Sequence, residues 1–467
     1  MSDDRPLSPP TGSDNRSPTR LILLLAILSA SIYLALAFAG DMRQRLPIFF
    51  AAHAALLAMM WLTRGTMSGR RSGFGFVIGA ALVFRVVVAF GEPALSDDVY
   101  RYVWDGRVQL HGFHPYAHAP DDPALEGLRD GDWEKINHPQ LKTIYPPVAQ
   151  MLFLTLAALG AGPFGFRLVL GLIDFAVVLA LTYLLRRLRL PRDRVVLYAW
   201  NPLAVIETAG SGHVEPLGIA LVVLAAAWII DRRPGVSTLA LGGAVHAKLV
   251  PLLLVPGYLR RYRMREVLLL ALVLVGLILP YALTGPAVGA GLFAYAERWE
   301  FNSSVYGCVE TLFQALHTGE NLKPAIGWLQ GIFDVSWIPW GGVYRWAWPP
   351  FLARVVVGLG LLAWVLRLTF KPGLDAARES FLVLAGLLVL SPTVYPWYVL
   401  WVLPFAATYL SWPWLAFAAL VVLSYVGQGE ALPWWVLWVE YLTLFGLFAG
   451  GAVKRRIDRR AGRAHRS

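Results

Sequence analysis

Two adjacent carboxylates, Asp97 and Asp98, stand where a long apolar run gives way to a polar segment. They belong to the stretch 96–107, which reads SDDVYRYVWDGR. Neighbouring carboxylates repel each other, and partial desolvation at the end of an apolar helix raises their free energy further. A carboxylate in such a place is suited to remove a proton from a hydroxyl group. We interpret the pair as the candidate catalytic base. The alternative is a solvated loop with a local ion pair between Asp97 and Arg101.

Three cations stand in or beside apolar runs, where hydrocarbon disfavours charge. Arg85, Lys248 and Arg354 are predicted to bind a phosphate group, because fixed cations stabilise phosphate oxygens through charge-assisted hydrogen bonds. For the two arginines the alternative is that the side chain extends to the membrane interface.

Three further polar residues, Glu207, His213 and Glu215, are predicted to contact substrate. The alternative for His213 and Glu215 is that they satisfy the start of the helix that follows. Asp174 lies deeper within its apolar run and is predicted to be a packing partner.

The composition predicts a membrane protein. Hydrophobic residues make up 57% of the 467 residues, and the mean hydropathy is +0.55. Several apolar runs exceed the roughly 18 residues that a helix needs to cross the hydrocarbon core. The net charge of +11 comes from short clusters between these runs, which indicates cytoplasmic loops and not a nucleic-acid surface. The single cysteine, Cys308, excludes a disulfide between two cysteines of the sequence.

Placing the basic clusters inside gives an all-α polytopic fold of about twelve transmembrane helices. Residues 1–20 are predicted to be a disordered cytoplasmic tail, 21–453 the transmembrane domain and 454–467 a basic cytoplasmic tail. Two polar loops, 92–145 and 284–348, then face the outside. The run 236–259 is predicted to be a re-entrant hairpin or two short broken helices, and 147–159 an interfacial helix. The spans are predicted near 21–39, 47–63, 74–91, 164–186, 195–210, 213–231, 265–283, 350–369, 380–394, 397–411, 413–428 and 433–453.

Beyond the first motif, the sequence contains GFHPY at 112–116, NHP at 137–139 and YPP at 145–147. Weaker motifs are NP at 201–202, GHVE at 212–215, KLVP at 248–251, RWEFN at 298–302 and SPTVYPWY at 391–398. Together they resemble the GT-C glycosyltransferases that use polyprenyl-phosphate sugars, especially the bacterial mannosyltransferase-like branch. The resemblance covers about residues 75–410, and its specific part is the first loop.

This resemblance implies an acidic residue of the first outer loop as the base, interfacial helices in that loop and a lipid-linked donor that enters between helices. Asp98 is preferred to Asp97, although relatives differ over whether one or two acids stand in the motif. Further residues of these motifs are predicted to contact substrate: Tyr100, Arg101, Tyr116, His138, Tyr145, Arg298, Asn302 and Tyr395.

The predicted reaction is the inverting transfer of a hexose, with mannose the expected sugar, from a polyprenyl phosphate to a hydroxyl of a lipid or glycan acceptor. The predicted location is the outer face of the bacterial plasma membrane, in contact with membrane lipids. No cofactor and no metal site are expected, because one phosphate needs less charge neutralisation than a diphosphate. The rival interpretations are a transporter or flippase of lipid-linked glycans, and a polymerase or ligase of such glycans. A first loop packed over an outer cavity favours the transferase, whereas a pathway between two similar halves favours transport.

Overall fold

A computed structural model describes residues 16–68, 73–93, 95–285, 291, 299–333, 347–427 and 431–464. Helices provide the regular structure of these residues, apart from an isolated bridge between Phe301 and Thr393. The all-α prediction is therefore confirmed. Helix α1 already begins at Arg16, inside the predicted tail 1–20, and most of that tail lies outside the described residues.

Six helices in the described part of the chain are long and apolar enough to cross a membrane. The predicted total of twelve spans is not confirmed. The six are α1 (Arg16–Ala37), α2 (Leu46–Met67), α6 (Pro163–Arg187), α12 (Met264–Thr284), α18 (Pro349–Thr369) and α22 (Trp434–Ala464).

The other predicted spans are shorter or broken. Proline has no backbone N–H and disrupts a continuous helix, and it divides some of these runs into short pieces. The run 195–210 divides at Asn201-Pro202 into α7 (Val196–Ala199), α8 (Pro202–Val205) and the π-helix η5 (Ile206–Gly210). The remaining shorter elements are α3 (Phe74–Ala89), α9 (Glu215–Ile230), α19 (Ala376–Leu390), η8 (Pro396–Trp401), α20 (Leu403–Tyr409), α21 (Trp412–Leu420) and η9 (Val421–Gly427).

The run 236–259 forms broken helices, which was one of its two predicted forms. Helix α10 (Pro234–Ala247) ends at Lys248, whose backbone is extended, and η6 (Val250–Leu254) and α11 (Val255–Leu259) follow. The break leaves Lys248 outside regular helix.

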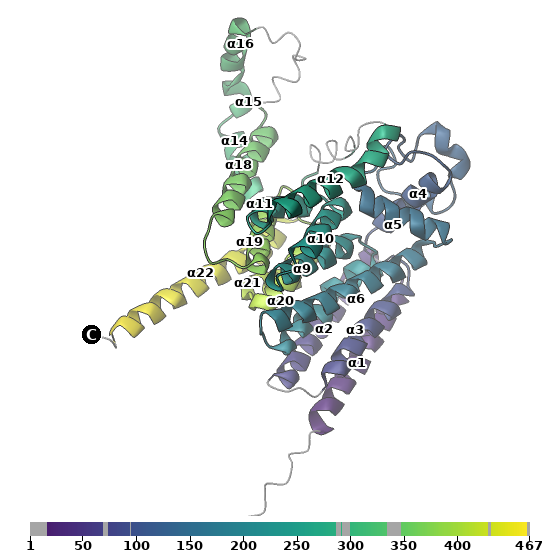
Figure 1. The fold of residues 1–467 in the computed structure, drawn as a ribbon, viewed down its shortest axis with the longest axis vertical. Coiled ribbons are helices and arrows are strands. Elements are labelled where there is room, and N and C mark those ends of the chain that lie inside the picture. Colours follow the sequence, from purple (N-terminus) through teal and green to yellow (C-terminus); the bar gives the residue numbers. More distant parts are fainter. Residues whose placement is uncertain are drawn as a thin grey trace, which may run out of the picture.

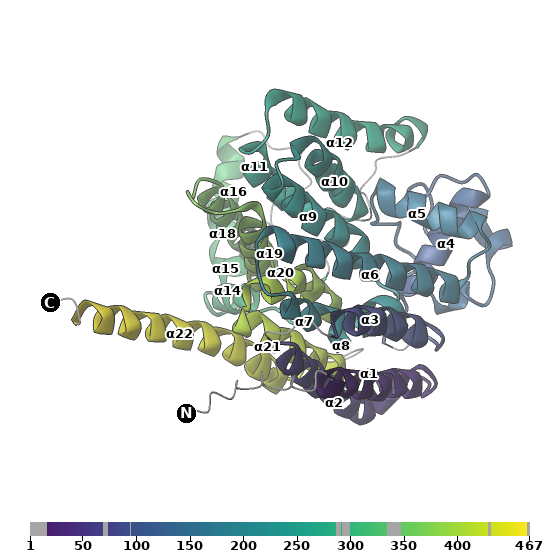
Figure 2. The same ribbon diagram turned by 60° about the horizontal axis from the view of Figure 1, so that its bottom comes forward.

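The first predicted outer loop contains α4 (Asp98–Leu110), η2 (Pro123–Leu128) and η3 (Trp133–Lys135), and α5 (Pro147–Ala158) follows it. Helices α4 and α5 pack against each other at one end of the molecule (Figure 1). The second loop contains α14 (Val305–Ala315), α15 (Thr318–Asn321) and α16 (Lys323–Ile332), while α22 extends away from the body (Figure 2). The short helices η1 (Met42–Arg45) and η4 (Arg192–Val195) join their neighbours.

The largest apolar core lies among α3, α6, α9 and the pieces of the broken run 195–210. Helix α6 contacts α3, α9 and η5, and it also contacts α4. Gly212, with φ of +85°, shows how closely they approach. A Cβ at that position would lie 2.8 Å from the Arg167 side chain of α6 and 3.1 Å from Val99 of α4.

Candidate active site

A cavity of about 220 Å³ opens between the first loop and the broken helices. It is lined by the beginning of α4, the segment 137–145, Lys248, Trp299 and the segment that leads into η8. Seven predicted site residues share this cavity: Asp97, Asp98, Arg101, His138, Tyr145, Lys248 and Tyr395.

Asp97, just before α4, and Asp98, its first residue, present their carboxylates to the cavity. The backbone N–H of Asp98 donates to Ser96 Oγ at 3.3 Å, and Asp98 is the first residue of the helix. The N-terminus of a helix carries partial positive charge and stabilises a carboxylate placed there. The sequence therefore folds in a way that favours an ionised Asp98.

The two carboxylates have different partners. Asn137 Nδ2 donates to Asp98 Oδ1 at 3.2 Å, and His213 Nδ1 lies 3.5 Å from Asp98 Oδ2. Burial acts to raise the pKa of Asp98, but His213 and Asn137 outweigh it, and the pKa lies below its ordinary value. Asp97 instead accepts from Arg43 at 2.7 Å. Arg43 thus pairs with a carboxylate that lines the cavity.

His213 lies in the turn between η5 and α9, with both ring nitrogens facing carboxylates. Nδ1 faces Asp98, and Nε2 lies 3.4 Å from Glu207 Oε2. Burial acts to lower the pKa of His213, yet the two carboxylates raise it to about 9. The Trp397 ring stacks on the imidazole, with ring centres 3.9 Å apart and planes 18° apart.

Lys248 is the cation that faces the cavity from the break after α10. Its ammonium pairs with the buried carboxylate of Glu215 and lies 4.8 Å from the centre of the Tyr398 ring. An ammonium group has three donors, so the pair with Glu215 leaves capacity for an anion.

A second cavity of about 210 Å³ adjoins the first, and its walls are almost wholly apolar. The two cavities share Ile144, Tyr145, Lys248 and Tyr398. Leu249, Val250 and leucines of α19 form most of the remaining wall. Lys248 therefore stands at the boundary between a polar space and an apolar space.

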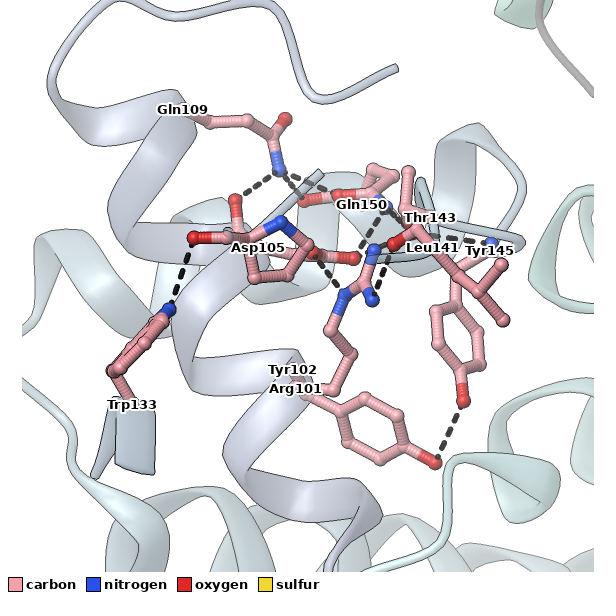
Figure 3. A network of polar contacts seen from close by, with 10 residues as sticks. Arg101, Tyr102, Asp105, Gln109, Trp133, Leu141, Thr143, Tyr145 and Gln150 are labelled. Carbon is pink, nitrogen blue, oxygen red and sulfur yellow. Dashed lines mark hydrogen bonds and ion pairs between the residues drawn. The ribbon is translucent and has the colours of Figure 1, made fainter. Parts of the chain in front are cut away.

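A buried polar network joins residues 141–143 of the first loop to α4 and α5 (Figure 3). Arg101 donates to Asp105 at 2.8 Å and to the carbonyl of Leu141 at 2.9 Å. Asp105 also accepts from Thr143 at 2.5 Å and from Gln150 at 3.1 Å. Arg101 lines the cavity, but the network shows that it also fixes the segment that forms one wall.

Trp299 forms another part of the wall, and the segment 299–302 that carries it is fixed by backbone and side-chain bonds. Phe301 exchanges backbone hydrogen bonds with Pro392 and Val394, at 3.1 and 2.8 Å. Asn302 is buried and donates to Glu440 of α22 at 2.8 Å. Asn302, which is predicted to contact substrate, positions the segment that carries Trp299 and is not on the described lining of this cavity.

The structure does not support a phosphate-binding role for Arg85. Its guanidinium is buried, donates to Asp174 of α6 at 2.7 Å and also bonds the carbonyls of Ala81 and Ala199. The predicted packing role of Asp174 agrees with this arrangement. A guanidinium enclosed in this way has no path to a lipid phosphate.

The other predicted residues lie around the cavity and not on its described lining. Arg354 Nη2 pairs with Glu300 at 2.7 Å, next to Trp299. The Tyr116 hydroxyl donates to the carbonyl of Tyr145 at 2.7 Å, and Tyr100 lies beneath Lys135. Glu207 and Glu215 reach the cavity through His213 and Lys248. Arg298 lies outside the described residues.

Sequence reasoning gave no role to Asn137, Trp397 and Tyr398. Each stands in a motif, NHP at 137–139 or SPTVYPWY at 391–398, and this was the only available signal. Within the described ranges, no three His, Cys, Asp or Glu side chains come together in a way that could hold a metal ion.

A family model described as alpha-(1->6)-mannopyranosyltransferase, N-terminal domain, matches residues 26–261 of this chain. The match covers the first loop, His213 and Lys248. Neither the curated proteins nor the solved structures contain a match.

Proposed function

We propose, since the chain belongs to the alpha-(1→6)-mannopyranosyltransferase family, that it moves mannose from a polyprenyl-phosphate donor to a hydroxyl of a lipid or glycan acceptor. The family match shows a glycosyltransferase, and the apolar helices indicate a membrane protein. The observation that supports the finer proposal is the junction at Lys248 between the polar cavity that holds Asp98 and the apolar cavity.

The donor fits this junction by its chemistry. A polyprenyl phosphate has one end that is an anion and another that is hydrocarbon, and Lys248 stands where the two cavities meet. The ammonium would bind the phosphate, and the apolar cavity would hold the first part of the chain. Burial of each CH₂ group contributes about 0.8 kcal/mol. The sugar would then lie in the polar cavity beside the carboxylates.

Asp98 is the proposed base. Its carboxylate accepts the proton of the acceptor hydroxyl as that oxygen forms a bond to the anomeric carbon. The bond from this carbon to the phosphate oxygen breaks, and its electron pair leaves with the phosphate beside Lys248. The chemistry uses fixed charges of the protein, so we propose no cofactor.

A single displacement inverts the anomeric carbon. The family description names an α-(1→6) linkage, so a donor consumed by inversion carries its mannose in the β configuration. The acceptor would be a C6 hydroxyl, which projects from its ring and reaches into a narrow cavity more easily than a ring hydroxyl.

The arrangement supports transfer over transport. Segment 137–145 of the first loop lines the cavity together with α4, so the loop covers the site. We propose that this side faces the outside of the bacterial plasma membrane, as the basic clusters indicate.

The test is incubation of the purified protein in lipid nanodiscs with radiolabelled donors and a mannoside acceptor. The donors are polyprenyl-phosphate mannose, polyprenyl-phosphate glucose and a nucleotide-linked mannose. We expect label transfer from the polyprenyl-phosphate mannose, and an α-mannosidase that cleaves (1→6) linkages should release it. Transfer from the nucleotide donor instead would overturn the proposed donor.

A further inference from the structure

The buried groups behind Asp98 form a chain that leads away from the cavity. His213 lies between the carboxylates of Asp98 and Glu207, at 3.5 and 3.4 Å. The Tyr425 hydroxyl then donates to Glu207 Oε1 at 2.6 Å. We propose that His213 and Glu207 are a positioning pair that holds Asp98 ionised and oriented toward the acceptor hydroxyl. This inference rests on the proposed role of Asp98 as the base.

Local structure fixes the pair. Glu207 belongs to the π-helix η5, a rare form often found at functional sites. The backbone N–H of His213 donates to the carbonyl of Glu207 at 3.0 Å, which closes the turn that contains Gly212. Because Gly212 has φ of +85° and contacts both α4 and α6, a larger residue there would displace His213 from Asp98.

Because His213 and Glu207 are buried, the nearby carboxylates take the place of water as partners of the imidazole. The side chains of His213 and Glu207 are 0% and 1% exposed. Neither ring nitrogen has a hydrogen bond of good geometry within the described structure, so the contacts to Asp98 and Glu207 are long ion-pair contacts. Such contacts are often long before substrate binds and shorten in the reactive complex. The stacked Trp397 fixes the plane of the ring along the line between the carboxylates.

The charges explain why two carboxylates are needed. An imidazolium between them keeps Asp98 ionised at neutral pH, as its lowered pKa indicates. When Asp98 accepts the proton of the acceptor, Glu207 still holds the imidazolium in place. The positive charge beside the newly neutral carboxyl then favours release of that proton, which restores the base for the next transfer.

Charged and titratable groups face the pair from several elements. Lys248 acts on Asp98 from the break after α10, and Asn137 contacts it from the loop. Four tyrosines also interact electrostatically with Asp98, and one glutamate interacts with two of these tyrosines. The groups are Tyr102 on α4, Tyr145 before α5, Glu215 on α9, Tyr395 before η8 and Tyr425 on η9.

The directions of the pKa shifts of Asp98 and His213 define a pH window for activity. The folded pKa of Asp98 is lowered, so its ion pair is present at neutral pH and is lost as pH falls through that pKa. The folded pKa of His213 is raised from 6.5 to about 9, so its contribution is complete below 6.5 and is lost as pH rises through about 9. We expect kcat/KM to fall on the acid side and again near pH 9.

The test compares His213→Gln and Glu207→Gln with the unmodified chain. His118→Gln is the matched control, because His118 is also a histidine beside a carboxylate, but its partner is Asp122 of the first loop, at 2.7 Å, and not Asp98. We expect the acid limb of kcat/KM to move to higher pH in His213→Gln, since Asp98 loses its cationic partner. In Glu207→Gln we expect the basic limb to move to lower pH, since His213 keeps a single carboxylate and its pKa falls. The apparent KM for the donor should change little, while kcat falls. The control should keep the unmodified profile.

A second readout does not depend on turnover. The infrared carboxyl band that disappears in Asp98→Asn reports protonation of Asp98 as the pH is lowered. It should appear at higher pH in His213→Gln, and the basic limb of Glu207→Gln provides a separate test if the first variant does not fold. A band and an acid limb that stay in place in folded His213→Gln, or a basic limb that stays in place in folded Glu207→Gln, would overturn the positioning role. Absence of transfer by the unmodified chain would overturn the proposed function instead, with the band still measurable.

Discussion

At the scale of single residues, Asp97 and Asp98 differ in what holds them. Asp98 has a neutral amide and an imidazole as partners, whereas Asp97 is paired with Arg43. We expect Asp98→Asn to lower kcat about 10²- to 10⁴-fold, the usual contribution of a general base. Asp97→Asn should have a smaller effect. Steady-state transfer assays with thermal unfolding as a check on folding measure both. A greater loss of kcat in Asp97→Asn than in Asp98→Asn would indicate that Asp97 is the base.

A second prediction at the scale of residues concerns the affinity of Lys248 for the donor phosphate. A charge-assisted hydrogen bond is worth about 1.5–3 kcal/mol. Lys248→Gln should therefore raise the apparent dissociation constant of the donor about ten-fold or more. Lys142, which lines the same polar cavity but not the apolar one, provides the matched control Lys142→Gln. Equal weakening by the two substitutions would indicate a diffuse effect of charge and no specific phosphate site.

At the scale of elements, Arg85 joins α3 to α6 and to the carbonyl of Ala199 in α7. Removing one partner of a buried ion pair costs about 3–5 kcal/mol, because the other charge remains buried. Arg85→Gln should therefore lower the unfolding temperature markedly. Folded protein should bind donor as before.

The control for Arg85 is Arg107→Gln on α4. Arg107 pairs with Asp130 in a partly exposed ion pair, and such pairs contribute about 0–1 kcal/mol. Thermal unfolding in detergent compares the two variants, and donor titration follows in whichever remains folded. Weaker donor binding with unchanged stability in Arg85→Gln would indicate that Arg85 binds the donor phosphate.

The sequence predicted these elements unevenly, for physical reasons. Hydropathy located the apolar runs, since a helix buried in lipid needs apolar side chains along its whole length. It averaged over Asn201-Pro202 and Pro404, and therefore missed that the runs 195–210 and 397–411 are broken. The charge of Arg85 was visible, but its partner Asp174 is 89 residues away, and pairing across helices leaves no local pattern. Asp98, His213 and Lys248 were predicted because each stands in a motif in or beside an apolar run.

At the scale of the whole molecule, the prediction concerns orientation. Cys308 on α14 is exposed and is the single cysteine of the chain. If the second loop is outside, a membrane-impermeant maleimide should label Cys308 in intact cells. With Cys308 replaced by Ser, Lys371→Cys should stay unlabelled until the membrane is opened. Lys371 lies in the exposed turn after α18, where Arg260 donates to the carbonyl of Thr369. The reverse order of labelling would place Asp98 in the cytoplasm.

The apolar cavity beside Lys248 measures only about 210 Å³, which is far less than a whole polyprenyl chain occupies. Under the proposed function, the protein would therefore hold the isoprene units nearest the phosphate and leave the remainder among the membrane lipids. Chain length beyond those units would then have no contact through which to affect the rate. A cell that altered the length of its carrier lipid would keep this step running at an unchanged pace, whereas saturation or branching next to the phosphate would slow it.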